Sequence, residues 1–368
     1  MVNMARRWRR WAVVTTAVVG VLAVVALNWG RIREAVNDRA ASSAVSEAAR
    51  SPEAAESAMD PAPVPEIGEL TVTGEQSLGE RSTRYRVETD LIPAEETDGG
   101  QPSVVVTLPE DYDESRDYPV LYLLAGTAEG ETPAKWVDKA AVEDATADLD
   151  AIVVSVDDGS YGWYSDWTVP GDSARAWRSF HLEQVVPWVD STFPTIDDPQ
   201  SRAIAGASAG GFGAMTYAEQ RPDLFGSAAS FSGLLSFDAQ ADRELVMGEV
   251  YGLTGSAHDL FGNGERTTQA DWAANDPSKH TEALKGTPVR VYTGSADDFE
   301  SRLASTSETF ARAAEDSGAE VTVTTYGDLN DAGAETPAGT CGEGHEWTCW
   351  SMALKDWASD LQAQFDPE

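Results

Sequence analysis

The sequence is short of the residues on which several kinds of protein depend. It has 2 cysteines in 368 residues, too few for a disulfide-stapled miniprotein or a four-cysteine zinc site. It has 26 Lys and Arg against 62 Asp and Glu, and the net charge of −36 argues against wrapping nucleic acid or docking broadly on anionic lipid. Its 4 histidines leave few candidates for imidazole chemistry. With 42% hydrophobic residues, the chain still has enough apolar side chains for a globular core.

The first 30 residues have the layout of an export signal or membrane anchor. Four arginines precede an uncharged apolar run over residues 11–29. As a helix, these 19 residues would span about 28 Å, nearly the roughly 30 Å of a bilayer core. No convincing cleavage site follows, so both a cleaved signal and an uncleaved anchor remain open. In either case the rest of the chain is expected outside the cytoplasmic membrane, secreted or anchored there and facing the cell envelope.

Residues 31–68 are expected to form a disordered, acidic tether rich in Ala and Pro. They contain almost no aromatic or β-branched residues, so they cannot bury enough apolar surface to fold alone. The tether would join the N-terminal segment to a folded domain over residues 69–368.

In this domain, short apolar runs alternate with amphipathic stretches. The runs cover residues 85–87, 103–108, 120–124, 152–156, 202–205, 289–292 and 321–325, and the clearest helical stretches cover 177–193, 210–225 and 305–318. Continuous apolar strands that alternate with helices predict an α/β fold with a mostly parallel central sheet and helices on both faces.

The segment Gly206-Ala207-Ser208-Ala209-Gly210 matches the G-x-S-x-G motif. It follows the apolar run 202–205 directly and opens the helical stretch 210–225. This context predicts a strand–turn–helix elbow with Ser208 at its tip, as for the nucleophile of an α/β hydrolase. The positive end of the helix dipole would then favour a developing oxyanion. The alternative is a Gly/Ser turn that carries no chemistry.

A serine nucleophile of this kind is followed along the chain by an acid and then by a histidine. His345 fits that order, because it lies in a glycine-rich loop between the last predicted strand and the last predicted helix. The other three histidines are expected to be surface or packing residues: His181, His258 and His280.

The acid is expected on the loop after the penultimate predicted strand. Three carboxylates lie there: Asp297, Asp298 and Glu300. Spacing alone does not choose among them.

Six stretches carry a more specific signal. They are YPVLYLLAG (118–126), GWYSDWTVP (162–170), the segment 202–235 around the G-x-S-x-G motif, WAANDP (272–277), VRVYTG (289–294) and GHEWTCW (344–350). Through these stretches, residues 102–350 resemble the esterase D superfamily of α/β hydrolases, and within it the secreted mycolyltransferases of mycolic-acid-containing bacteria. The YSDW and Trp-x-x-Asn-Asp-Pro blocks are fairly specific to that branch.

The resemblance implies roles for individual residues. Ser208 corresponds to the nucleophile and His345 to the base. In the family the acid is a Glu at the start of the following helix, and Glu300 occupies that place, with Asp297 and Asp298 as the alternatives. The oxyanion donors would be the backbone N–H groups of two further residues, Thr127 and Ala209.

The sequence also departs from the family. Where the family commonly has Asp-Gly after the strand VLYLL, with the Asp helping to hold a sugar acceptor, this chain has Ala125-Gly126. The disulfide that the family often places after YSDW is missing. Instead, Cys341 and Cys349 flank His345, and outside the membrane they are expected to form a disulfide, with two buried free thiols as the alternative.

The function expected from the resemblance is serine-dependent acyl transfer in the cell envelope. A mycolic-type acyl chain would move from an ester or glycolipid donor, through an acyl-enzyme, to a sugar or other hydroxyl acceptor. The alternatives are a secreted carboxylesterase that uses water and a catalytically silent binding protein on the same scaffold. We expect no metal, no organic cofactor and no nucleic-acid partner. Membrane contact is expected only through the N-terminal segment, if it stays uncleaved.

Overall fold

The computed structural model describes residues 69–93, 101–127, 132–168 and 175–366. The expected export segment (1–30) and tether (31–68) lie outside the described residues. Within the described ranges, no helix is long and apolar enough to cross a membrane.

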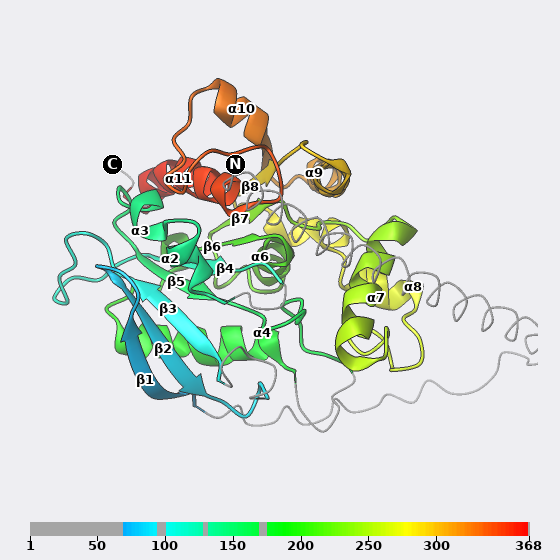
Figure 1. Cartoon of the computed structure of the whole chain (residues 1–368), viewed down its shortest axis with the longest axis horizontal. Helices are drawn as coiled ribbons and strands as arrows, with labels where there is room; N and C mark the ends of the chain where they lie inside the picture. Colours follow the sequence, from blue (N-terminus) through cyan, green and yellow to red (C-terminus); the bar gives the residue numbers. More distant parts are fainter. Residues whose placement is uncertain (1–68, 94–100, 128–131, 169–174, 367–368) are drawn as a thin grey trace, which may run out of the picture. The chain divides into compact units, whose positions relative to one another are not determined.

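A central sheet forms the middle layer of the domain (Figure 1). Its strands are β1 (Thr71–Ser77), β2 (Ser82–Glu88), β3 (Ser103–Thr107), β4 (Val120–Leu124), β5 (Ile152–Val156), β6 (Arg202–Ala207), β7 (Ser227–Phe231), β8 (Val289–Thr293) and β9 (Val321–Thr325). Among the described residues the order is β1-β2-β3-β5-β4-β6-β7-β8-β9. The strands from β5 to β9 pair in parallel, and β1, β2 and β3 add antiparallel strands at one edge. The predicted, mostly parallel sheet is confirmed.

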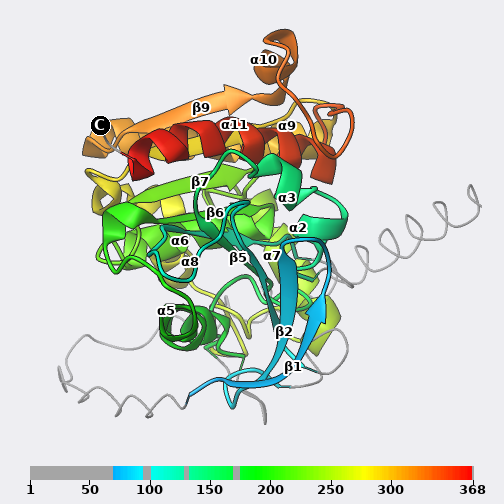
Figure 2. The same cartoon turned by 90° about the vertical axis from the view of Figure 1, so that its left-hand side faces the viewer.

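Helices cover both faces of the sheet, as predicted (Figure 2). One face carries α4 (Trp177–Ser179), the π-helical turn η2 (Phe180–Val185), α5 (Val186–Thr192), α6 (Ala209–Gln220) and α9 (Asp298–Ser317). The other face carries α2 (Lys135–Asp138), α3 (Val142–Ala145) and α11 (Trp347–Phe365). Side chains of β4 alternate between the two cores, because successive residues of a strand point to opposite faces: Tyr122 packs in the first core, and Leu121 and Leu123 in the second.

Between β7 and β8 the chain leaves the sheet and forms α7 (Gln240–Thr254) and α8 (Gln269–Ala274) (Figure 1). These helices build a third apolar cluster with Trp163, Phe212 and Leu303. The cluster lies beside the start of α6. The remaining short elements are η3 (Pro199–Ser201), η4 (Pro277–Lys279), η5 (Thr281–Leu284) and α10 (Tyr326–Asp331).

Two strands are not predicted by the apolar pattern. β7 has the sequence SAASF, whose small residues have little intrinsic preference for a strand, yet all five residues are buried in the centre of the sheet. β1 lies at the open edge of the sheet and is largely exposed, so it lacks the apolar alternation that marks a half-buried strand.

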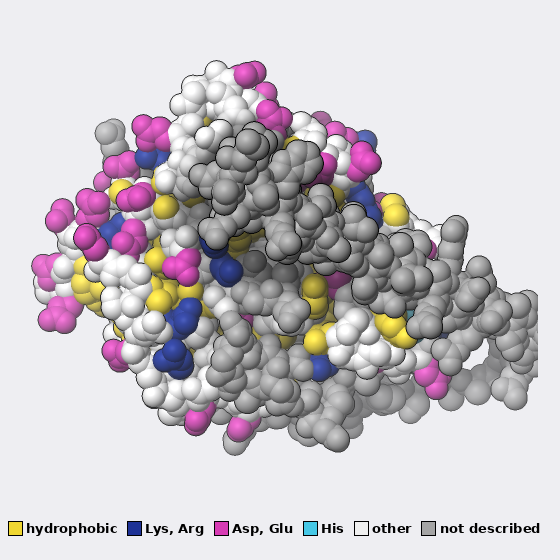
Figure 3. Space-filling view, in the orientation of Figure 1, with side chains coloured by type: hydrophobic (Ala, Val, Ile, Leu, Met, Phe, Trp, Pro, Cys, Tyr) yellow, Lys and Arg dark blue, Asp and Glu magenta, His cyan; other side chains and the backbone are white. Residues whose placement is uncertain are grey.

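Exposed acidic side chains occur along the whole described part of the chain, from Glu75 of β1 to Asp360 of α11. In Figure 3, Asp and Glu are distributed around the visible face, with fewer Lys and Arg among them. This spread fits a general contribution of negative charge to solubility better than a single acidic binding patch.

Candidate active site

Ser208 lies at the tip of the predicted elbow, between the end of β6 and the start of α6. Its backbone has φ 56° and ψ −121°, a conformation that residues with a side chain rarely adopt. Its N–H donates to the carbonyl of Phe231 at 2.9 Å, and its own carbonyl accepts from Gly211 at 2.9 Å. The strained turn is therefore held from both the sheet and the helix.

The two glycines of the motif allow α6 to lie directly on the sheet. A Cβ atom at Gly206 would come within 2.2 Å of the Gly210 carbonyl oxygen, and one at Gly210 within 2.4 Å of the Leu124 carbonyl oxygen. Real Cβ atoms do not tolerate such distances from backbone atoms. The spacing of the motif is thus a packing requirement of the elbow.

The structure brings Ser208, His345 and Glu300 together across more than one hundred residues of sequence. Nε2 of His345 lies 2.9 Å from Oγ of Ser208, and Nδ1 lies 2.6 Å from Oε1 of Glu300. Glu300 is fully buried, and the His345 side chain is 22% exposed. The arrangement suits a histidine whose Nδ1–H donates to the carboxylate while Nε2 accepts from the serine hydroxyl.

Among the three candidate acids, Glu300 is the one that contacts His345. It lies in the first turn of α9, and its Oε2 also accepts the Gly294 N–H at 3.2 Å. Asp297 caps the same helix instead, because its Oδ1 accepts the N–H groups of Phe299 and Glu300, each at 2.9 Å. Asp298 is an exposed residue of the first turn.

The His345 ring is held between two aromatic rings. Phe299 and Trp350 both meet it edge-on, with ring centroids 4.9 Å away in each case. The loop that carries His345 is also tied to the loop before α9, since the Glu343 carbonyl accepts the N–H groups of Ser295 and Ala296 at 3.1 and 3.2 Å. His345 and Glu300 are therefore positioned by one connected pair of loops.

A disulfide closes this histidine loop. Cys341 and Cys349 are bonded, with Cα atoms 4.6 Å apart, and Cys349 lies in the first turn of α11. These two sulfur atoms and Glu346 form a group whose possible ligand atoms lie within 4.8 Å of one another. Because both sulfurs are bonded to each other, they cannot act as thiolate metal ligands.

Replacing both cysteines by alanine is expected to destabilise the protein. Opening a cross-link over a loop of about nine residues should lower the free energy of unfolding by about 2–3 kcal/mol. Denaturant unfolding of the wild type and of the Cys341→Ala/Cys349→Ala variant measures this. Reductant should shift the wild-type midpoint toward that of the variant and leave the variant unchanged. Equal midpoints without reductant would show that the bond contributes no stability.

The two expected oxyanion donors lie next to Ser208. Ala209 is the first residue of α6, where a backbone N–H has no partner inside the helix. Thr127 follows the end of β4, and it lines the same hollow as Ala209 and Ser208. A Cβ atom at Gly126 would lie 3.5 Å from the Ser208 Cβ, so this loop approaches the serine closely.

Residues that the sequence reasoning missed support this loop from behind. The buried Tyr164 hydroxyl donates to the Ala125 carbonyl at 2.7 Å. Burial, together with the charge of neighbouring Asp157, raises the pKa of Asp158 well above its usual range, and its carboxyl lies beside the Thr127 hydroxyl. Tyr164 is the first residue of the YSDW block, so the sequence marks it as part of a family-specific motif. No motif in the sequence marks Asp158.

The segment that supplies these groups has an unusual backbone. Tyr161, Trp163 and Tyr164 all have positive φ, at 61°, 52° and 47°. Such strain persists only where the surroundings enforce it, and it clusters at functional sites.

The other histidines lie apart from the serine. His181 is buried among aromatic rings, with Nδ1 3.0 Å from the Tyr217 hydroxyl, and burial lowers its pKa to about 3. Nδ1 of His258 lies 3.1 Å from the Thr267 hydroxyl, and Nε2 of the exposed His280 lies 3.0 Å from the Ala273 carbonyl.

A hollow of about 240 Å³ opens beside the serine and histidine. Its walls are mainly apolar, and the side chains that form them are Trp163, Leu234, Leu245, Phe299 and Leu303. One further side chain in the wall is acidic, Glu249 of α7. No motif in the sequence indicates Glu249 or the helix α7 that carries it.

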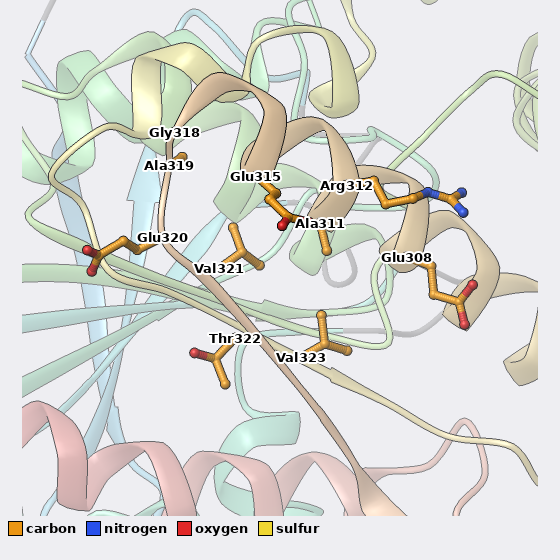
Figure 4. A pocket seen from close by; sticks show the side chains of 10 residues that line it. All are labelled: Glu308, Ala311, Arg312, Glu315, Gly318, Ala319, Glu320, Val321, Thr322 and Val323. Carbon is orange, nitrogen blue, oxygen red and sulfur yellow. The ribbon is translucent and has the colours of Figure 1, made fainter.

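A larger surface hollow of about 790 Å³ lies elsewhere, between the second half of α9 and the edge strand β9 (Figure 4). Glu308, Arg312 and Glu315 project from the helix, and Val321 and Val323 from the strand. Glu300 is at the opposite end of α9, so this hollow is separate from the serine site.

A serine on a strand–helix elbow, at the carboxyl end of a mostly parallel sheet, places the domain among the α/β hydrolases. A family model described as "Putative esterase" matches residues 95–361, and the chain belongs to this esterase family.

Individual relatives agree with this assignment. Esterase Rv1288 of Mycobacterium tuberculosis is 34% identical over 230 residues, which make up 61% of this chain and 48% of that protein. Diacylglycerol acyltransferase/mycolyltransferase Ag85A of Mycobacterium leprae is 28% identical over 183 residues, or 47% of this chain and 53% of the relative. The chain thus spans about half the length of these curated relatives. The crystal structure of Mycobacterium tuberculosis MPT51 is similar in fold, with a TM-score of 0.57 at 20% identity, over 75% of this chain and 97% of that one.

Proposed function

We propose that this esterase-family domain is a serine acyltransferase of the cell envelope, with Ser208 as nucleophile, His345 as general base and Glu300 as the acid that orients the imidazole. The observation that carries the proposal is the continuous chain of contacts from the serine hydroxyl to the buried carboxylate, at 2.9 and 2.6 Å. A nucleophile, its base and the group that orients the base within hydrogen-bond reach are the signature of covalent acyl transfer.

In the first step, Oγ of Ser208 attacks the carbonyl carbon of the donor ester while its proton passes to Nε2 of His345. The oxyanion receives hydrogen bonds from the backbone N–H groups of Thr127 and Ala209. The carbon–oxygen bond to the leaving alkoxide then breaks, and the alkoxide takes the proton from Nε2. Glu300 stays ionised throughout, bonded to the Nδ1–H, and an acyl-enzyme ester on Ser208 remains.

In the second step, an acceptor hydroxyl gives its proton to Nε2 of His345 and attacks the acyl carbonyl. The Ser208 ester bond breaks, and Oγ recovers the proton. A sugar or glycolipid hydroxyl gives transfer, whereas water gives hydrolysis. The apolar walls of the hollow support transfer, because they limit the access of water to the acyl-enzyme.

Hydrolysis by water is the alternative, and one observation favours it. Position 125 is a buried alanine, so it offers no carboxylate to a sugar. A catalytically silent binding protein on the same scaffold is a third possibility. The hydrogen-bonded set of Ser208, His345 and Glu300 argues against it.

Product analysis separates transfer from hydrolysis. The full-length protein is incubated with a trehalose mycolate and labelled trehalose, and lipids and free acids are quantified. We expect label to enter glycolipid faster than free mycolic acid accumulates. Free acid without labelled glycolipid would establish the esterase alternative, and neither product would favour the silent scaffold.

We also propose that residues 1–30 export or anchor the chain and that residues 31–68 tether the domain outside the cytoplasmic membrane. The apolar run at 11–29 supports this location. Protease added to intact cells that express the full chain should remove the domain. Protection of the domain in intact cells, with cleavage only after lysis, would contradict it.

A further inference from the structure

Glu249 is a carboxyl group in the wall of the active-site hollow that the proposed chemistry does not use. It comes from α7, outside the central sheet, and lines the same 240 Å³ space as Ser208 and His345. Burial raises the pKa of Glu249 to about 7, and the Trp163 hydrogen bond opposes this rise. No Lys or Arg among the described residues acts as a cause of the shift.

The carboxyl group is held in place by its neighbour. The Trp163 indole N–H donates to Oε2 of Glu249 at 3.0 Å. Trp163 is itself 3% exposed and meets the Phe212 ring edge-on, with centroids 5.6 Å apart. One carboxyl oxygen is thus fixed, and within the described residues Oε1 receives no side-chain or backbone donor. A carboxyl group that is fixed through one oxygen can accept a hydrogen bond from a ligand through the other oxygen.

Holding a carboxyl in this wall costs stability. Glu249 is partly buried, and an acid partly removed from water without a paired cation is less stable in its ionised form, so a neutral side chain of the same shape would avoid part of that cost. Polar groups whose pKa is shifted by burial in a cleft are candidates for function. Glu249 meets this description, and among the described residues no hydrogen bond or ion pair joins it to Ser208 or His345.

The hollow limits what Glu249 can bind. At about 240 Å³ it is smaller than the 300–1,000 Å³ typical of pockets for drug-sized ligands, so it holds one end of a substrate. Aromatic side chains of Tyr161, Trp163 and Phe299 line it, and Trp163 bonds the carboxyl. Flat apolar rings next to a hydrogen-bonding carboxyl match a sugar ring, which presents C–H faces and outward hydroxyls.

We propose that Glu249 binds hydroxyl groups of the acyl acceptor and seats one sugar ring beside the acyl-enzyme. This rests on the proposed acyl transfer and adds a residue that would bind the sugar acceptor. A hydroxyl can donate to the carboxylate or accept from the protonated acid, so it suits a group that titrates near neutral pH. An ammonium ligand would need the ionised form alone.

The test uses the full-length protein with Glu249→Gln and Glu249→Leu. Gln keeps an oxygen for the Trp163 N–H but loses the charge, which makes hydrogen bonds to hydroxyls about twice as strong. At about pH 8, above the pKa of about 7, we expect Glu249→Gln to raise the KM for trehalose in acyl transfer at least about tenfold, and Glu249→Leu to raise it further. Hydrolysis of a short p-nitrophenyl ester, which uses water and not the sugar, should lose much less activity than sugar transfer does, and the Gln variant should melt no lower than wild type at this pH.

Glu244→Gln is the matched control, because Glu244 lies on the same helix and bonds the exposed Gln240. It should leave the KM for trehalose and the rate of ester hydrolysis unchanged. An unchanged trehalose KM in Glu249→Gln, or an equal loss of ester hydrolysis, would overturn the proposal and leave the acyltransferase function standing.

If the wild type transfers no acyl group to a sugar, a binding measurement tests the sugar site independently of transfer. Calorimetry with full-length Ser208→Ala measures trehalose binding without turnover. If trehalose binds to Ser208→Ala and adding Glu249→Leu to that variant abolishes the binding, the sugar site is supported although the transfer function fails. Absence of trehalose binding, or binding of tetramethylammonium in its place, would overturn the sugar site.

Discussion

Replacing Ser208 by alanine is expected to lower kcat for ester cleavage by about 10⁴–10⁶-fold, with the fold intact. The loss is this large because attack, proton transfer and acyl-enzyme formation all need the same oxygen atom. Steady-state kinetics on a short ester measures kcat, and circular dichroism checks that the variant is folded.

Ser305→Ala is the control, since Ser305 is an exposed serine on α9. It should retain wild-type kcat. A fluorophosphonate probe should label the wild type and the Ser305→Ala variant but not Ser208→Ala. If Ser208→Ala keeps more than about a tenth of the activity, or still takes the label, another residue is the nucleophile.

The second large effect is expected at Glu300. Glu300→Gln replaces the charged acceptor of the His345 Nδ1–H by a neutral amide, whose NH2 group can face Nδ1 and favour the wrong tautomer, which should lower kcat by about 10³–10⁴-fold with little change in KM. The residue is fully buried, and Gln has almost the same volume, so the fold should survive. Steady-state kinetics and thermal melting together separate loss of chemistry from loss of structure.

Asp297→Asn and Asp298→Asn test the assignment of the acid. Asn caps a helix about as well as Asp, so Asp297→Asn should keep both α9 and kcat near wild type. If Asp297→Asn or Asp298→Asn lowers kcat more than Glu300→Gln does, a different carboxylate orients the histidine.

The elbow and the histidine loop could be predicted because short sequence patterns indicate each of them. The G-x-S-x-G motif stands between a strand pattern and a helix pattern, although part of the need for its glycines comes from the distant strand β4, and His345 stands between a strand and a helix that have clear patterns. The choice among three acids could not be made from spacing. It depends on which of three neighbouring residues turns inward at the start of α9, and Asp297 turns back to cap the helix.

The parts that sequence reasoning missed are set by tertiary packing. β7 is a strand because its small residues fit between β6 and β8 under two layers of helices, although their own preference is weak. Glu249 reads as one more surface acid in a polar helix. It becomes distinctive only because α7 folds over the elbow and places it in the same hollow as Ser208.

The most direct test of the proposed chemistry is the mass of the protein during turnover. The full-length wild type is mixed with a mycolyl or shorter acyl ester, quenched in acid within the first turnovers, digested and examined by mass spectrometry. We predict an added acyl group on the peptide that contains Ser208, absent from Ser208→Ala and lost when an acceptor sugar is added. An acyl group on a different residue, or rapid turnover of the ester by Ser208→Ala, would contradict covalent catalysis by Ser208.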